Sequence, residues 1–155
     1  MEPVVSTVDL YRKDPRPGDR TELGSYTLNA GEIVAFASQW DPQFFHVDEN
    51  RAAREGYFGG LIASGVQTLA VYQRLTVDSL VRSWDVVGGA GIRDLKFLRP
   101  VRPGDTLTGF TVIEEVQNQP DRCRVRVVYT GELINQNREP VLVLTMSAYL
   151  RMRDV

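Results

Sequence analysis

The spacing of hydrophobic residues divides the chain near its midpoint. In the first half, apolar residues recur every three or four positions in GEIVAFASQW (31–40) and in GVQTLAVYQRLTVDSLVR (65–82), which predicts two helices. A shorter helix is predicted over 48–56, and Asn29 and Asp48 stand where the N-caps of the first and the short helix belong. The segment 65–82 is apolar around most of its circumference, so we expect it to be buried.

In the second half, apolar and polar residues alternate and β-branched side chains become frequent. This pattern predicts strands, and a short strand is also expected at 24–30. One buried helix followed by four antiparallel strands predicts an α+β fold, in which a curved sheet wraps around the helix. The four runs are 86–100, 107–117, 122–135 and 139–153, with turn signals at 99–105, 118–121 and 135–139.

Length and composition predict one domain over residues 1–155. Hydrophobic residues make up 43% of the chain and charged residues 25%, a balance typical of globular proteins with a proper core. No internal repeat or low-complexity tract divides the sequence. Residues 1–16 are predicted to form an extended N-terminal lead-in, with a turn within 15–19.

Charge and cysteine content argue against several classes of function. A net charge of −2 without a basic block argues against a nucleic-acid partner. One cysteine and one histidine form neither an internal disulfide nor a Cys/His zinc site, so no metal site is predicted. No segment has the apolar length of a membrane span or of a signal peptide core, so we expect a cytoplasmic protein without membrane contact.

Two features of the second half are expected to be structural. GGAGIRDL (88–95) has glycines like those of a dinucleotide-binding loop, but such a loop leads into a helix, whereas IRDLKFLRP continues as strand. We expect these glycines to permit a bulge or close packing on the buried helix. Cys123 lies between Arg122 and Arg124 in a predicted strand, where we expect it to pack.

The segment DPQFFHVD (41–48) holds the only histidine of the chain, His46, five residues after Asp41. An imidazole titrates near neutral pH, and a neighbouring carboxylate can orient it. The pair is therefore a candidate for proton transfer, and the alternative is a surface turn that happens to contain both. Five aromatic residues gather around the pair and either wall an apolar slot or belong to the ordinary core: Trp40, Phe44, Phe45, Tyr57 and Phe58.

The segment FGGLIASGVQTLA (58–70) leads through a flexible turn into the predicted central helix. The first amides of a helix lack partners within it and carry partial positive charge. Gly65 has no side chain to keep an oxygen from its N–H, so this N–H is a candidate oxyanion donor. The structural alternative is that Ser64 caps the helix and Gly65 relieves crowding; the two interpretations are compatible.

Together these segments resemble the hydratase signature of the MaoC-like dehydratase family, which includes R-specific enoyl-CoA hydratases. The family's loop has the form Asp-x-Asn-Pro-x-His-x-Asp, and Asp41, His46 and Asp48 stand at its acidic and histidine positions. The stretch GGAGIRDLKFLRPVRPGDTL is also similar to the family's sequence after the central helix. The resemblance extends from about residue 17 to the last predicted strand.

A second family segment, Phe-x-x-Pro-Ile-x-x-Gly, is matched by Phe58, Ile62 and Gly65. The sequence departs from the family without losing a catalytic group. The departures are Gln43 in place of Asn, Phe44 in place of Pro, Leu61 in place of Pro, and Ser64 at a position that is often His.

The resemblance implies a hot-dog fold, a homodimer or a higher even oligomer, and reversible hydration of a trans-2-enoyl thioester. By carry-over, Asp41 and His46 hold and activate the water, and the N–H of Gly65 polarises the thioester carbonyl. No metal or redox cofactor is needed; CoA or phosphopantetheine enters as part of the substrate. The predicted substrate-binding residues are Phe44, Phe45, Phe58, Ser64, Arg93 and Arg99.

Arg93, Lys96, Arg99 and Arg102 form a basic row that could meet the phosphates of the thioester carrier, or could simply be solvated. Two other functions remain open. The first is a catalytically silent acyl-CoA-binding module, which the loss of the loop proline at Phe44 favours. The second is an acyl-CoA thioesterase on the same fold, which would release free thiol.

Overall fold

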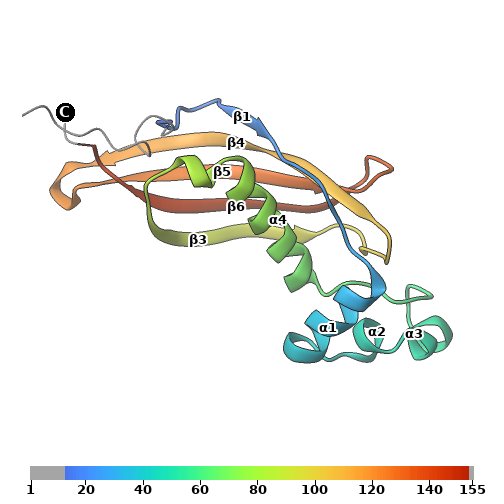
Figure 1. The fold of residues 1–155 in the computed structure, drawn as a ribbon. Coiled ribbons are helices and arrows are strands. Elements are labelled where there is room, and N and C mark those ends of the chain that lie inside the picture. Colours follow the sequence, from blue (N-terminus) through green and yellow to red (C-terminus); the bar gives the residue numbers. More distant parts are fainter. Residues whose placement is uncertain (1–12, 154–155) are drawn as a thin grey trace, which may run out of the picture.

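The computed structural model describes residues 13–153, in which an antiparallel sheet curves around one long helix. The helix, α4 (Gly65–Ser79), lies against the concave face of the sheet (Figure 1). The strand order is β1-β4-β5-β6-β3, and β2 pairs separately with β4. This is the α+β arrangement that the sequence pattern predicts, and it is the hot-dog fold that the family resemblance implies. The strands are β1 (Arg20–Glu22), β2 (Tyr26–Thr27), β3 (Val86–Phe97), β4 (Thr106–Gln119), β5 (Arg124–Ile134) and β6 (Pro140–Arg151).

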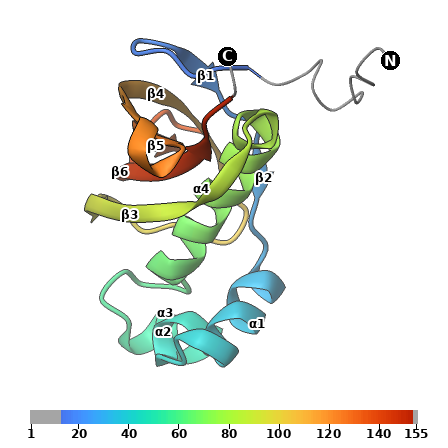
Figure 2. The ribbon, with the colours of Figure 1, turned by 90° about the vertical axis from the view of Figure 1, so that its left-hand side faces the viewer.

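Three shorter helices lie together beyond one end of α4 (Figure 2). The first begins at a capping box, in which the Asn29 side chain and the Glu32 carboxylate each accept the other residue's backbone N–H. Asp48 caps the third helix, so both predicted N-caps are confirmed. None of the helices in the described residues is long and apolar enough to cross a membrane. The three helices are α1 (Ala30–Trp40), α2 (Phe44–Val47) and α3 (Glu49–Glu55).

The central helix is buried as predicted, but its inward face is more polar than its sequence pattern suggests. Thr68, Tyr72 and Thr76 are buried against the sheet, whereas Val66 is 54% exposed. The apolar part of the inward face joins one core with side chains from three strands. Its members include Val71 and Leu75 from α4, Leu107 from β4, Leu133 from β5, and Leu142 and Leu144 from β6.

Other local features differ from expectation. β1 forms in a segment expected to have no strand, because β4 offers it an edge to pair with. The central helix ends at Ser79 rather than at residue 82, and a 3-10 turn (Val81–Ser83) follows it. Cys123 is not packed in a strand: it is exposed, at a left-handed φ of 50°, in the turn that reverses the chain between β4 and β5. Residues 1–12 of the predicted lead-in lie outside the described residues.

The glycine-rich part of β3 is irregular. Its pairing with β6 shifts register between Val86 and Gly88 and again between Gly89 and Gly91. The predicted bulge is therefore confirmed. The alternative, that these glycines pack closely on the helix, is wrong for Gly88 and Gly89, because a Cβ at either position would have no heavy atom within 4 Å.

The turn before β4 holds the loop that precedes α4 in place. The buried carboxylate of Asp105 shapes this turn by accepting the N–H of Arg102 at 2.8 Å. From the turn, the carbonyl of Val101 accepts the N–H of Ala63 at 2.8 Å. The Arg102 guanidinium donates to the carbonyl of Phe58 at 2.9 Å. These bonds place the loop, the turn and the first residues of α4 side by side.

Candidate active site

Asp41 and His46 come together because the chain reverses between two helices. Asp41 is the C-cap of α1, and α2 starts only three residues later. α2 contains His46, whose side chain is turned inward and is only 5% exposed. The Nε2 atom of His46 lies 3.3 Å from Oδ2 of Asp41. The structure therefore brings together Asp41 and His46, the two side chains that the sequence analysis proposed as a pair.

Asp41 is held by two further donors. The hydroxyl of Ser64 donates to Oδ2 of Asp41 at 2.8 Å, and the side-chain amide of Gln43 donates to Oδ1 at 2.8 Å. These hydrogen bonds, that of Ser64 first, lower the pKa of Asp41 below its ordinary value, because they stabilise the ionised form. Asp41 is therefore a fixed carboxylate at neutral pH.

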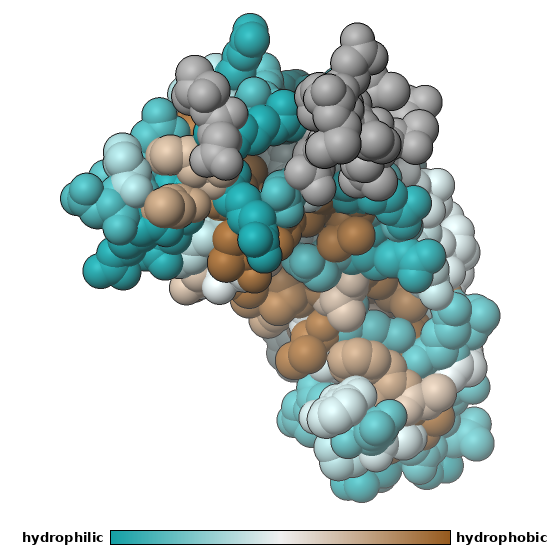
Figure 3. Space-filling view, turned by 60° about the vertical axis from the view of Figure 1, so that its left-hand side comes forward, coloured by the Kyte–Doolittle hydropathy of each residue, from teal (hydrophilic) through white to brown (hydrophobic). Residues whose placement is uncertain are grey.

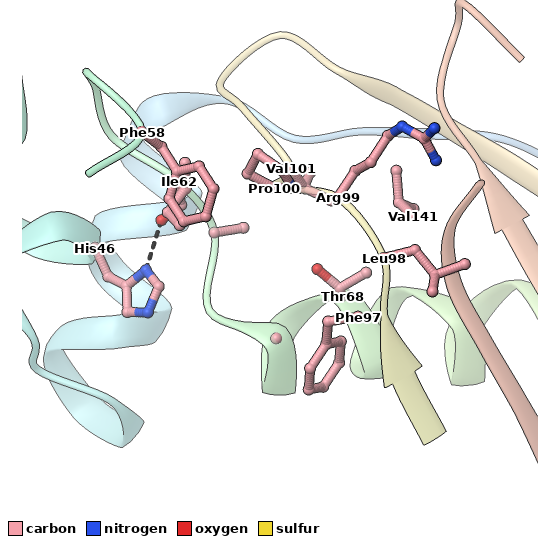
Figure 4. A pocket seen from close by; sticks show the side chains of 12 residues that line it. His46, Phe58, Ile62, Thr68, Phe97, Leu98, Arg99, Pro100, Val101 and Val141 are labelled. Atoms are coloured by element: carbon pink, nitrogen blue, oxygen red, sulfur yellow. Dashed lines mark hydrogen bonds between the residues drawn. The ribbon is translucent and has the colours of Figure 1, made fainter. Parts of the chain in front are cut away.

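The orientation of the His46 ring is set from its other side. Nδ1 of His46 lies 2.7 Å from the carbonyl oxygen of Ile62 (dashed in Figure 4). Because a carbonyl oxygen only accepts, Nδ1 carries the proton. In the neutral imidazole, Nε2 then presents a lone pair toward the Asp41 carboxylate. Nε2 of His46 and Oδ2 of Asp41 are then two hydrogen-bond acceptors 3.3 Å apart. One water molecule can donate an O–H group to each of them.

The N–H of Gly65 opens α4 one residue after Ser64. As the first residue of the helix, Gly65 has no acceptor within it, and no hydrogen bond from its N–H is found within residues 13–153. The ring of Phe97 covers this position so closely that a Cβ on residue 65 would lie 2.7 Å from the ring. Residue 65 must therefore lack a side chain to fit against Phe97, as the structural alternative predicted. Its N–H also remains without a hydrogen-bond acceptor among the described residues.

His46 and Gly65 line one pocket, with a volume of about 230 Å³. Figure 4 shows His46, Phe58 and Ile62 on one side of it, and Leu98, Arg99 and Val141 on the other. Most of the lining is apolar, and Thr68 contributes from the second turn of α4. A backbone donor and an imidazole thus share a space that an apolar chain could fill.

The predicted substrate-binding residues are only partly brought together. Phe58 and Arg99 line the pocket. Arg99 donates to the carbonyl of Pro140 at 3.0 Å, and its guanidinium points away from His46 in Figure 4. Arg93 lies on β3 away from the pocket and faces Asp94 at 3.7 Å.

The remaining predicted contacts support the Asp41–His46 pair rather than line the pocket. Phe45 packs edge-on against His46, with ring centroids 4.4 Å apart. Phe44 packs against Phe45 and lies under the guanidinium of Arg51, at 4.2 Å. Ser64 uses its hydroxyl proton on Asp41 and accepts the N–H of Val66 at 3.2 Å, so it caps α4 as the structural alternative proposed.

Sequence reasoning missed several participants. The contact with the Ile62 carbonyl could not be predicted, because a backbone oxygen does not depend on the type of side chain. Phe97, Val101 and Val141 reach the pocket from strands and turns remote in sequence. Only Gln43 had a local signal, because it stands two residues after Asp41 in the same loop. Across 13–153, no three His, Cys, Asp or Glu side chains are grouped closely enough to hold a metal ion.

Comparison with known proteins identifies the family. The profile described as "MaoC like domain" matches residues 13–136. The uncharacterized protein YdeM of Bacillus subtilis (strain 168) is 36% identical over 119 residues, which cover 77% of this chain and 82% of YdeM. The chain therefore belongs to the MaoC-like domain family.

Solved structures agree with this assignment. The crystal structure of the MaoC-like dehydratase from Rhodospirillum rubrum superposes with a TM-score of 0.80 at 36% identity, covering 92% of this chain and 97% of that chain. The R-hydratase PhaJ1 from Pseudomonas aeruginosa superposes with a TM-score of 0.72 at 21% identity, over 90% of this chain and 84% of that one. The second likeness establishes the shared fold.

Replacing Ser64 with alanine should raise the pKa of Asp41 and also remove the α4 cap. We expect the carboxyl of Asp41 in Ser64→Ala to titrate at higher pH than in the wild type, in an NMR titration of carboxyl-labelled protein. The free energy of unfolding should fall by about 1 kcal/mol through loss of the cap.

Part of the fall in the free energy of unfolding of Ser64→Ala is electrostatic, and this part becomes smaller as the pH falls. A depressed folded-state pKa stabilises the protein fully above the unfolded pKa, and this contribution disappears as pH falls through the folded pKa. The stability difference between wild type and Ser64→Ala should therefore narrow in acid. Ser38→Ala, at an exposed position of α1 near Asp41, is the control. An unchanged Asp41 titration in Ser64→Ala would contradict the assigned cause.

Proposed function

We propose that this protein is an acyl-thioester hydratase or dehydratase that adds water reversibly to a trans-2-enoyl thioester. The observation that carries the proposal is the 3.3 Å approach of Asp41 and His46, beside the open N–H of Gly65 and an apolar pocket. Membership of the MaoC-like domain family supports the reaction class.

In the proposed reaction, a water molecule donates one O–H to Asp41 and the other to His46. Its oxygen attacks the β-carbon of the enoyl group while the Asp41–His46 pair accepts one proton from the water, and the pair then returns a proton to the α-carbon. Negative charge develops on the thioester oxygen, which accepts a hydrogen bond from the N–H of Gly65. One such donor contributes about 2.7–4 kcal/mol to the transition state.

We assign proton acceptance to the Asp41–His46 pair acting on one water. The two donors on Asp41 keep it ionised, and the bond from Nδ1 to Ile62 keeps Nε2 available. An acceptor held in place before the reaction spares the reorganisation that solvent would require. The proposed chemistry uses no metal or redox cofactor.

The carrier of the acyl group is proposed to be CoA or the phosphopantetheine of a carrier protein. Arg102 stands beside the pocket, where a phosphate of the carrier could pair with it. The Arg99 guanidinium is already placed at the Pro140 carbonyl. Arg93, on β3 away from the pocket, is less well placed for this role than the sequence suggested. The cytoplasmic location stays a prediction.

The two rival functions differ from hydration in what they release. A silent binding module binds an acyl-CoA without changing it, and a thioesterase produces free thiol, which a thiol reagent detects. A silent module gives the paired carboxylate and imidazole no chemical task. A thioesterase would use the same pair to activate a hydrolytic water, so the thiol assay is what separates it from a hydratase.

We also propose that two copies associate through β3. This strand is at the end of the sheet, where its outer edge has no neighbour among the described strands. Its exposed apolar residues include Val86, Val87 and Ile92. A band of hydrophobic side chains crosses the face in Figure 3, between the sheet and helices α1–α3. Sedimentation should give twice the chain mass of 17.4 kDa, and 17.4 kDa for Ile92→Lys; a monomeric wild type would contradict the proposal.

The catalytic pair is tested by removing one group at a time. Asp41→Asn and His46→Gln should each lower kcat/KM for crotonyl-CoA hydration by about 10²–10⁴, measured as loss of enoyl absorbance. Asp48→Asn is the matched control, because asparagine can replace the α3 cap in the same loop. Equal activity in all variants would refute the assigned roles.

The oxyanion donor is tested with a matched pair at residue 65. Proline suits the first position of a helix and lacks an N–H, and Ser64 has the extended ψ of 139° that a following proline requires. Gly65→Ala introduces the same Cβ against Phe97 but keeps the N–H. We expect kcat of Gly65→Pro to fall about 10²–10³ below that of Gly65→Ala. Equal kcat values would exclude this N–H from the reaction.

A further inference from the structure

On its inner side the pocket that contains His46 and Gly65 is bounded by the protein's own core, whereas Phe97 and Leu98 on its outer side are 53% and 44% exposed. Val141 and Val101 line it and are 0% and 2% exposed. The backbone there is also paired, because the N–H of Leu98 donates to the carbonyl of Val141 at 2.8 Å. The far wall is thus the junction where β3 ends and β6 begins, which an acyl chain cannot part without breaking a strand pair.

The route along the helix is closed as well. Thr68 lines the pocket, and Tyr72, one turn further along α4, is completely buried. The tip of the Tyr72 ring touches the backbone of Gly131 on β5, so closely that a Cβ on residue 131 would lie within 2.4 Å of ring carbons. At this level the Tyr72 ring fills the space between α4 and β5. The pocket is therefore blind in these two directions.

We propose that this blind pocket restricts the enzyme to short enoyl thioesters, with acyl chains of about four to six carbons; this rests on the proposed function. The volume of about 230 Å³ lies below the roughly 300–1,000 Å³ of sites for drug-sized ligands. At about 30 Å³ for each group the size of a water molecule, it holds about eight groups. The thioester and the reacting water occupy part of that space.

The lining selects for an unsubstituted hydrocarbon end. The far wall presents Val101, Val141 and Leu98, and the hydroxyl of Thr68 donates to the carbonyl of Ser64 at 3.4 Å. Arg99, the one cation of the lining, has its guanidinium at the Pro140 carbonyl. A polar or charged chain end would lose its hydration there without a partner.

The inference is tested with trans-2-enoyl-CoA substrates of four, six, eight and ten carbons. In the wild type, kcat/KM should hold or rise from four to six carbons and fall about tenfold or more by ten. Val141→Ala should raise the ratio of eight-carbon to six-carbon activity, by about fourfold for each methylene newly admitted. Leu98→Ala, at a half-exposed position of the same wall, serves if Val141→Ala fails to fold.

The matched control is Val143→Ala. Val143 lies two residues along β6 and faces a hollow on the other side of the sheet, so its chain-length profile should equal that of the wild type. Ten-carbon activity equal to four-carbon activity in the wild type would overturn the inference. So would unchanged profiles in both wall variants.

Failure of the proposed function is distinguishable from failure of the inference. Hydration of no substrate would overturn the function. The pocket is then tested by calorimetric titration with saturated butyryl-CoA and decanoyl-CoA. Tighter binding of the butyryl compound supports a short blind pocket, and equal or weaker binding overturns it.

Discussion

The hydroxyl of Ser64 connects the two halves of the candidate active site. Its proton goes to Asp41 and its oxygen accepts the N–H of Val66, so one atom fixes the carboxylate and caps α4. Because Gly65 is the next residue, the open N–H is held in a set relation to the carboxylate. A proton acceptor and an oxyanion donor are useful only when both face the same substrate atoms. The relative position of these two groups therefore depends on this one side chain.

The burial of α4 gives this arrangement a rigid support, and it has a cost. The hydroxyls of Tyr72, Thr76 and Thr111 are buried without hydrogen-bond partners among the described residues, and burial raises the pKa of Tyr72 above its ordinary value. Such groups destabilise a core unless something satisfies them. The Tyr72 ring fits only because residue 131 is glycine. The close packing of α4 against the sheet therefore leaves buried hydroxyl groups without hydrogen-bond partners among the described residues.

The sequence predicted what local patterns encode. Asn29 and Asp48 were recognisable as caps, the central helix as buried, and Asp41 with His46 as a pair, because each signal lies within a few residues. Partners brought in by folding were not predictable in this way. The Ile62 carbonyl orients His46 from sixteen residues away, and Val141 closes the pocket from the start of β6. The polar inward face of α4 was not predicted. Threonine is a residue type that usually lies at the surface, but Thr68 and Thr76 are buried. Cys123 was misplaced because the reversal between β4 and β5 falls inside its apparent strand.

The loss of the loop proline at Phe44 bears on whether the pair can work. Phe44 is the first residue of α2, where proline is favoured because an N–H has no helical acceptor and φ is already suitable. A non-proline residue there forgoes mainly the reduced entropy of the unfolded chain, about 0.4–1 kcal/mol. The turn still closes through the N–H of Asp48 to the Phe44 carbonyl at 2.9 Å, and Arg51 stacks on the Phe44 ring. The substitution thus affects mainly the stability of a short helix, and the approach of His46 to Asp41 forms without the proline. The loss of the proline at Phe44 is therefore no longer an argument for a catalytically silent module.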